Sequence, residues 1–410
     1  MNPMRRPLLA ALAGIAGLGT AGALALWPDE GLLNPCLAPQ AERWRADPLV
    51  RAALDGLDPA ALWDVHAHLL PVGTAIHLHG PWPWPVMYAQ ARLQDNAACV
   101  APEATDPVRA FLGPLVERLA AMPPGARVML LAMDDFYDER GRIKPERTHF
   151  SVSNDTCAAA VRIWPDRFAW AASVHPHRGD ALEELARVRG LGARALKWIP
   201  QAQGIDPASP RCDAIYRALA ASGLPLITHG GDERATAGDD ALGNPLRLRR
   251  ALDAGVKVIV AHCATMGHGA DLDRGPNAPA RPNFTYFERL MADDRYRDRL
   301  FGDLSAIPQR ARSGPVLATL LERGAVGGDW QRRLLYGSDH PIPGAMPLFS
   351  VRELASQGYL ADADVDTLRT LRRHNAWLFD LVLKRRLRHR GRGFAPDVFA
   401  TRRVLEPRAS

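Results

Sequence analysis

The sequence is poor in cysteine and lacks the nucleophile motif of the common serine hydrolases. Its five cysteines, in a chain of 410 residues, form no C-x-x-C pair and no zinc-finger spacing. An odd number of thiols cannot all pair internally, which argues against a disulfide framework and leaves open one bridge, between Cys36 and Cys99, in an oxidising compartment. No G-x-S-x-G elbow occurs, which argues against a serine hydrolase on an α/β-hydrolase fold.

Positive charge is in small excess, and the excess lies in one place. The net charge is +6, from 51 Lys and Arg against 45 Asp and Glu, while the stretch 384–392 (KRRLRHRGR) contains no acid. Such a stretch would suit anionic lipid or nucleic acid, but it lacks interleaved aromatic residues. We interpret it as the solvated end of a helix followed by a basic tail over 384–410, and we expect no nucleic-acid binding.

Only one long apolar run is present, over residues 7–27. It carries no charge, follows Arg5 and Arg6, and stops before Asp29 and Glu30. This arrangement predicts an export signal or an uncleaved transmembrane anchor within residues 1–30, followed by a connector over 31–60. We therefore expect the rest of the chain outside the cytoplasm, on the periplasmic side if the organism is bacterial.

Short apolar runs recur beyond residue 61, with amphipathic helical stretches between them. This alternation is typical of parallel βαβ units and predicts a TIM-type (β/α)8 barrel over 61–383, with a doubly wound open sheet as the alternative. The predicted strands cover residues 61–65, 127–133, 168–174, 193–199, 224–228, 256–261, 300–304 and 334–336. In such a barrel, the chemistry lies at the carboxyl ends of the strands.

Polar side chains that can bind a metal stand at these ends. His66 and His68 are two residues apart, so on a strand they face the same side. The other candidates follow or lie in later runs: Lys197, His229, His262 and Asp339. Neutral imidazoles and a carboxylate are ligands that Zn²⁺ and similar ions accept, and the set as a whole predicts a divalent-metal site.

On these residues, the sequence resembles the amidohydrolase superfamily, in the branch that includes aminocarboxymuconate semialdehyde decarboxylase. The resemblance covers about residues 61–380 and implies a distorted barrel with one or two divalent ions, zinc before others. It assigns metal binding to the strand-end residues His66, His68, His229 and Asp339. His262 either ligates or acts on the substrate.

The resemblance also gives Lys197 a role, as a carboxylated bridge between two metals in binuclear members. Two other interpretations of Lys197 stay open: a cation for a substrate carboxylate and a structural ion-pair partner.

The predicted function is a hydrolase that activates water to cleave an amide, cyclic amide or ester bond of a small molecule. A metal ion lowers the pKa of bound water toward about 7, Asp339 carries the proton to the leaving group, and His262 polarises the substrate or donates a proton. A decarboxylase with the same metal ligands is the alternative. A non-catalytic envelope binding protein is disfavoured, because the set of ligands is complete. The sequence predicts no oligomeric state.

Two long connections, over 69–126 and 263–299, are expected to shape substrate access. Trp82 and Trp84 in the first are candidates for an apolar pocket wall. His175 and His177 end the third run and are candidate substrate contacts at the pocket mouth. His77 and His79 repeat the His-x-His spacing within a loop and are not expected to bind metal, and Asp303 is expected to hydrogen-bond within the structure rather than to ligate.

Overall fold

The computed structural model describes residues 28–69, 84–100, 106–275 and 278–406. Its main sheet has eight strands in the order β1-β2-β3-β4-β5-β6-β9-β10, and every neighbouring pair is parallel. The strands are β1 (Trp63–His68), β2 (Arg127–Leu131), β3 (Phe168–Ala172), β4 (Ala195–Trp198), β5 (Leu226–His229), β6 (Val258–Ala261), β9 (Leu300–Asp303) and β10 (Leu334–Leu335).

The first and last strands lie against each other and close the ring. Val65 N donates to Tyr336 O at 3.1 Å, and His68 N donates to His340 O at 2.8 Å. Each predicted strand overlaps an observed one, and the predicted barrel is confirmed, whereas the open-sheet alternative is wrong.

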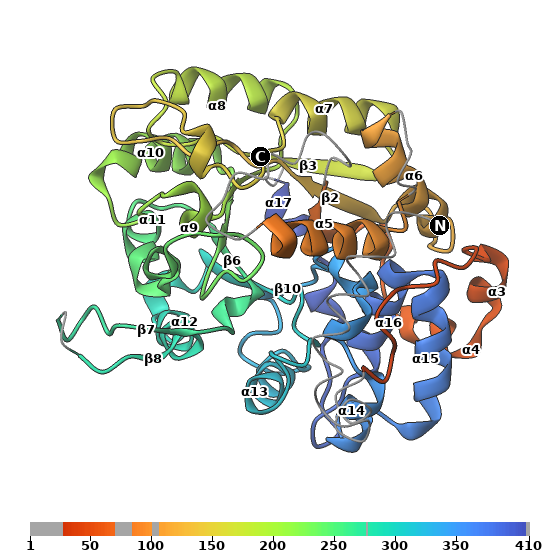
Figure 1. Cartoon of the computed structure of the whole chain (residues 1–410). Coiled ribbons are helices and arrows are strands. Elements are labelled where there is room, and N and C mark those ends of the chain that lie inside the picture. The colour runs from red at the N-terminus through yellow and green to blue at the C-terminus, as the bar shows by residue number, and fades with distance from the viewer. Residues whose placement is uncertain (1–27, 70–83, 101–105, 276–277, 407–410) are drawn as a thin grey trace.

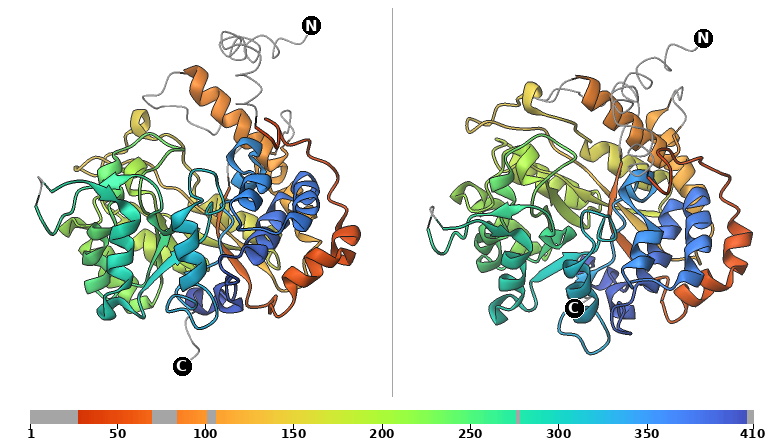
Figure 2. Two further views of the ribbon diagram at one scale, coloured as in Figure 1. Left: turned by 90° about the horizontal axis from the view of Figure 1, so that it is seen from below. Right: turned by 60° about the horizontal axis from the view of Figure 1, so that its bottom comes forward.

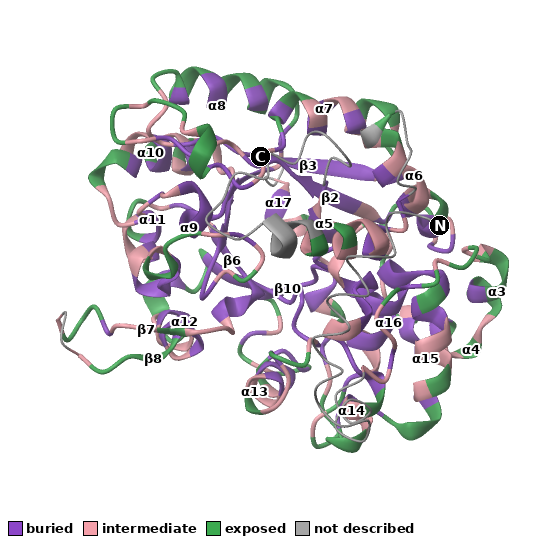
Figure 3. Cartoon of the chain, viewed as in Figure 1, coloured by how far each residue is buried: buried purple, intermediate pink, exposed green. Residues whose placement is uncertain are grey.

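Helices surround the strands (Figure 1), and their inward faces are buried while their outward faces are exposed (Figure 3). The outer helices are α6 (Pro107–Leu119), α7 (Asn154–Ile163), α8 (Ala181–Gly190), α10 (Asp213–Ser222), α11 (Arg249–Asp253), α12 (Asn283–Met291), α13 (Pro315–Arg323), α14 (Val351–Ser356), α15 (Asp362–His374) and α16 (Ala376–Arg386). A short hairpin of β7 (His268–Gly269) and β8 (Arg281–Pro282) lies beside α12 (Figure 1) and projects from the body of the molecule in both further views (Figure 2).

The core has two layers, because successive strand residues face opposite sides. One apolar cluster fills the barrel and includes Val65, Met129, Ile227 and Ile259, while their sequence neighbours pack outward against the helices. An extra residue in β1 breaks this alternation between Asp64 and Ala67. Such a bulge re-aims side chains, and here it brings His66 and His68 to the cavity described below.

The C-terminal stretch corrects the sequence-based interpretation. The described part of the predicted tail is solvated only in part: Arg388, Arg390 and Arg392 are exposed, as expected, but Lys384 lies in α16 with no exposed surface. Further along, Tyr336 N donates to Val398 O at 2.9 Å. The final helix, α17 (Arg402–Leu405), adds Val404 and Leu405 to the apolar cluster inside the barrel. The tail therefore seals the end of the barrel at which the strands begin.

The predicted connector also packs on the barrel. It contains α3 (Ala41–Ala46) and α4 (Pro48–Leu54), with Trp44 and Val50 buried. The bridge between Cys36 and Cys99 is confirmed, and the other cysteines are free and buried. The predicted apolar segment over 7–27 lies outside the described residues, and within the described ranges no helix is long and apolar enough to cross a bilayer.

Candidate active site

A cavity of about 370 Å³ opens at the carboxyl ends of the strands. Helix α5 (Trp84–Ala98) lies in front of the barrel strands in Figure 1 and contributes Gln90 and Leu93 to the cavity wall, so the connection over 69–126 does shape access. Gln90 Nε2 donates to Ala235 O at 2.6 Å, which joins this helix to the loop after β5. The cavity wall includes six residues predicted from sequence: His66, His68, Lys197, His229, His262 and Asp339.

His66 is oriented by a buried carboxylate. Its Nδ1 lies 2.9 Å from Asp303 Oδ2, so Nδ1 carries the proton and Nε2 keeps its lone pair. Burial lowers the pKa of His66 to about 4, with Lys197 contributing, which keeps the ring neutral near pH 7. Asp303 therefore has the orienting role expected from the sequence, and a neutral imidazole held by a carboxylate is a typical metal ligand.

His262 is fixed in the same way by Ser305. Its Nδ1 lies 3.0 Å from Ser305 O, and because a carbonyl only accepts, Nδ1 must donate and Nε2 is left with the lone pair. The backbone at His262 has a positive φ of 55°, as has Asp339 at 65°. Such conformations are costly for residues other than glycine and concentrate at functional sites.

Asp339 completes a compact group of three possible ligands. One ligand atom from each of His66, His262 and Asp339 lies within 4.8 Å of the others. Burial pushes the pKa of Asp339 upward, but the charge that His262 and His66 acquire at low pH, with a hydrogen bond from His68, outweighs burial and holds the pKa well below its ordinary value. The carboxylate is therefore ionised and able to ligate.

Two predicted ligands stand beside this group rather than within it. His68 Nε2 lies 3.1 Å from Asp339 Oδ1. The ring of His229 is 5.0 Å from that of His262, but its Nδ1 is 3.1 Å from Glu233 Oε2 and its Nε2 is 3.3 Å from Asp232 O. His229 would have to release Asp232 O in order to bind an ion through Nε2.

Lys197 lies on β4, is buried, and faces the same cavity. Within the described part of the chain, its Nζ has no hydrogen-bond partner and no carboxylate within 4.0 Å. Burial lowers its pKa. The absence of a short contact counts against the structural ion-pair partner, although Asp303, Asp339 and Glu233 attract Lys197 from a distance, and the carboxylated bridge and the substrate cation stay open.

The residues present fit a divalent ion. A mixed set of imidazoles and one carboxylate is common for zinc, and the Nδ1 atoms of His66 and His262 are held by acceptors, as in known metal sites. When bound, such an ion supplies Lewis acidity and lowers the pKa of a water molecule that it holds.

Other predicted contacts lie elsewhere. His175 and His177 do not line this cavity: His175 Nε2 donates to Gln203 O at 3.0 Å, and His177 Nδ1 lies 3.2 Å from Asp138 O. The prediction that they contact substrate is not supported. Trp82, His77 and His79 lie outside the described residues, and Trp84 begins α5 without a described side chain.

Sequence reasoning missed several polar residues of the site, among them Glu233, Ser305 and Arg312. Glu233 follows His229 by four residues and Ser305 follows Asp303 by two, so proximity to the strand-end residues could have identified both. Arg312 stands among other arginines in QRARSG and carries no such signal.

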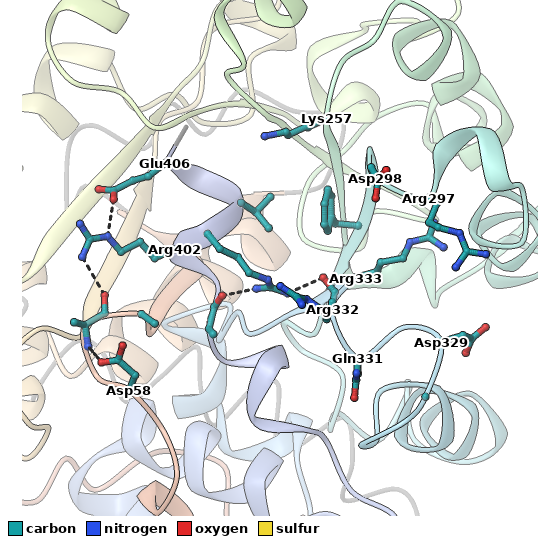
Figure 4. Close-up of a pocket in the computed structure, with 17 residues that line it drawn as sticks. Asp58, Lys257, Arg297, Asp298, Asp329, Gln331, Arg332, Arg333, Arg402 and Glu406 are labelled. Carbon is teal, nitrogen blue, oxygen red and sulfur yellow. Dashed lines mark hydrogen bonds and ion pairs between the residues drawn. The ribbon is translucent and has the colours of Figure 1, made fainter. Parts of the chain in front are cut away.

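The opposite end of the barrel has a larger hollow, of about 1240 Å³ (Figure 4). It is lined by residues that precede strands, such as Ala61, Lys257 and Arg333, and by the C-terminal Arg402 and Arg403. Arg402 is paired with Glu406 at 2.6 Å. The hollow contains no histidine or cysteine, and its position at the amino ends of the strands is not where barrels carry catalysis.

Solved structures with a similar chain path have low sequence identity. An uncharacterized TIM-barrel protein from Bordetella bronchiseptica is 15% identical, has a TM-score of 0.46, and is matched over 78% of this chain and 99% of that one. A putative 2-pyrone-4,6-dicarboxylic acid hydrolase from Pseudomonas putida is 17% identical (TM-score 0.43; 76% and 97% covered). A 2,6-dihydroxybenzoate decarboxylase from Rhizobium is 16% identical (TM-score 0.40; 78% and 99% covered).

No curated protein matches the chain in sequence. A family model does match it: the model described as Amidohydrolase covers residues 63–377, from the first residue of β1 to the first turn of α16. This range includes every strand of the barrel and every residue of the candidate metal group. The chain therefore belongs to this amidohydrolase family.

Proposed function

We propose that the protein is a metal-dependent hydrolase that cleaves an amide, cyclic amide or ester bond of a small molecule in the cavity beneath α5. The observation that carries this proposal is the convergence of His66, His262 and Asp339, whose ligand atoms lie within 4.8 Å of one another at the carboxyl ends of the strands. Membership of a metal-dependent family of enzymes supports it.

The protein groups have separate tasks in this proposal. Asp303 and Ser305 hold His66 and His262 in the tautomer that offers Nε2 to an ion. Asp339 is ionised, so its carboxylate can accept a proton from the attacking water and return it to the leaving group. Because Nε2 of His262 has a lone pair, that ring suits a ligand or a base better than a proton donor.

We further propose that one ion, zinc, is bound and that Lys197 is unmodified. The three residues form a single group of donors, and no second group is found among the described residues. His68 and His229 adjoin the group and would complete the coordination after small side-chain movements.

A decarboxylase is the second candidate. Lys197 places an unpaired cation in the cavity, and a substrate carboxylate would be its natural counter-charge. Product analysis separates the two reactions, because hydrolysis releases an acid with an amine or alcohol, whereas decarboxylation releases carbon dioxide.

The metal site is tested by replacing both His66 and His68 with alanine. After loading with Zn²⁺ and dialysis, elemental analysis should find close to one zinc per wild-type chain and near background in the double variant, with the circular dichroism spectrum retained. A matched variant with His268 and His389 replaced, two histidines away from the cavity, should bind as the wild type does. Full zinc content in the His66 and His68 variant would contradict the proposal.

We also propose that the barrel functions outside the cytoplasm. The apolar segment over 7–27 supports export, and the bridge between Cys36 and Cys99 suits an oxidising compartment. Cell fractionation of the producing organism should find the chain in the membrane or in the extracytoplasmic fraction. Recovery of the full-length chain from the cytosol with both cysteines reduced would overturn this proposal.

A further inference from the structure

We propose that Arg312, together with Lys197 in the wall of the same cavity, forms an anion subsite and binds a carboxylate group of the substrate away from the bond that is cleaved. This inference rests on the proposed use of the cavity as an active site. It adds that the substrate is a carboxylate with an apolar body.

Arg312 is buried without the partners that a buried guanidinium needs. It lies in the loop after β9, is 8% exposed, and lines the cavity. Its Nη1 donates to Thr265 Oγ1 at 2.8 Å, whereas its Nε has no hydrogen-bond partner and no described carboxylate lies within 4.0 Å. A guanidinium has five N–H donors, and leaving them unmet in a buried site is costly.

A structural arginine in the same molecule looks different. Arg372 is also fully buried, and its guanidinium is surrounded by backbone carbonyls: Nε donates to Pro343 O at 2.8 Å and Nη2 donates to Ala345 O at 2.8 Å. Arg372 thus joins the loop after β10 to α15. Arg312 has no comparable set of acceptors, so holding the fold together does not account for its burial.

The carboxylates nearest to the cavity are committed to other groups. Asp303 accepts from His66 Nδ1 at 2.9 Å and from His262 N at 3.0 Å. Glu233 accepts from Ala235 N at 2.6 Å and lies 3.1 Å from His229 Nδ1. Asp339 belongs to the metal group. Each of the three attracts Arg312 from a distance, but none lies within 4.0 Å of it, so a direct partner for its buried Nε has to come from a bound molecule.

Lys197, on a different strand, supports the same conclusion. It reaches the cavity from β4 and, like Arg312, has an unpartnered nitrogen on a buried side chain. Two buried cations without a direct ion-pair partner favour an anionic group next to them, and the planar fork of an arginine suits the two oxygens of a carboxylate.

The remaining wall indicates the body of the ligand. Apolar side chains face the cavity from several loops, and they include Leu93, Phe150, Ile199, Ile342 and Leu348. A cavity of about 370 Å³ with such a wall accepts a small, largely apolar molecule such as one ring with short substituents. The inferred substrate is therefore an amide or ester that carries a free carboxylate on an apolar, ring-sized body.

Equilibrium binding of benzoate and of benzamide, which share their shape and differ in charge, tests the subsite. Isothermal titration of both zinc-free and zinc-loaded protein should show benzoate binding at least about tenfold more tightly than benzamide, because a charge-assisted bidentate contact is made only by the carboxylate. Arg312→Met should lower this preference several-fold in the zinc-free form, where Lys197 is the remaining unpartnered cation and no ion can hold the carboxylate. The matched variant Arg234→Met should retain it, since Arg234 lines the same cavity but is neutralised by Asp232 at 2.7 Å.

Equal binding of benzoate and benzamide to the wild type, or an unchanged preference in Arg312→Met, would overturn the inference. Arg312→Lys serves if the methionine variant does not fold: it keeps the charge but loses the fork, and it should retain only part of the preference, whereas full retention counts against a bidentate contact. The zinc-free titrations separate this test from that of the proposed function. A wild type that binds no zinc removes the hydrolase proposal, while its preference for benzoate still decides the subsite.

Discussion

Two lysines, Lys197 and Lys384, are buried in this protein, and they differ in whether their ammonium groups have partners. Lys384 lies in α16 behind the barrel wall, where its Nζ donates to Asp380 Oδ2 at 2.6 Å and to Gly337 O at 2.7 Å. Lys197 lies on β4 at the cavity and donates to no described group. A buried charge with a full set of partners belongs to the fold, whereas one without partners points to a bound molecule.

Two buried carboxylates repeat the contrast. Burial raises the pKa of Asp380 to about 7 even though Lys384 opposes that effect. Burial also acts on Asp339, but three imidazoles outweigh it and keep the pKa well below its ordinary value. Near pH 7, Asp380 is therefore only partly ionised, whereas Asp339 in the cavity is ionised.

The largest effect on the free energy of unfolding is expected from breaking the buried ion pair of Lys384 and Asp380. Lys384→Met leaves Asp380 buried without its partner, and removal of one member of a buried pair costs about 3–5 kcal/mol of unfolding free energy. Urea denaturation followed by circular dichroism measures this loss. A change below about 1 kcal/mol would mean that the pair does not hold α16 to the strands.

The second prediction concerns the ionised carboxylate in the cavity. Asp339→Asn keeps the size and one oxygen but cannot accept and return a proton, so turnover should fall by roughly a hundredfold or more. The fall in turnover is measured by steady-state kinetics with an amide or ester substrate that carries a carboxylate, and zinc content is measured in parallel. Near-normal turnover with zinc in place would assign proton transfer to His262 instead.

The smallest effect on stability is expected at the unsatisfied lysine. Lys197→Met removes a desolvated charge that has no ion-pair partner, so the free energy of unfolding should change by less than about 1 kcal/mol or should rise. The same denaturation series as for Lys384→Met makes the pair of variants directly comparable. A loss as large as that in Lys384→Met would erase the distinction between the two lysines.

Most of the barrel could be predicted from sequence, because buried parallel strands leave continuous apolar runs such as VIVA before His262. The polar residues that end these runs identified the site, since the carboxyl ends of all strands meet on one face. His66 and His68 face the cavity as the spacing predicted, helped by a bulge that the spacing does not reveal.

The parts that could not be predicted depend on long-range packing. Arg312 follows a strand at a distance of several loop residues, and no periodicity says that its side chain turns inward. The sequence predicts that the basic stretch from Lys384 is solvated. It does not reveal that Asp380, one helical turn before Lys384, is buried and forms an ion pair with it. His175 ends a strand as His229 does, yet its ring is occupied by Gln203 O.

The seal formed by the C-terminal segment has a consequence for how the chain folds. Trp63 at the start of β1 donates its N–H to Thr401 Oγ1 at 2.9 Å, across a sequence separation of 338 residues. Contacts between residues so far apart in sequence form late in folding, because closing a long loop costs conformational entropy. The first strand, which carries the candidate ligands His66 and His68, therefore acquires its full set of neighbours only after nearly the whole chain has been synthesised.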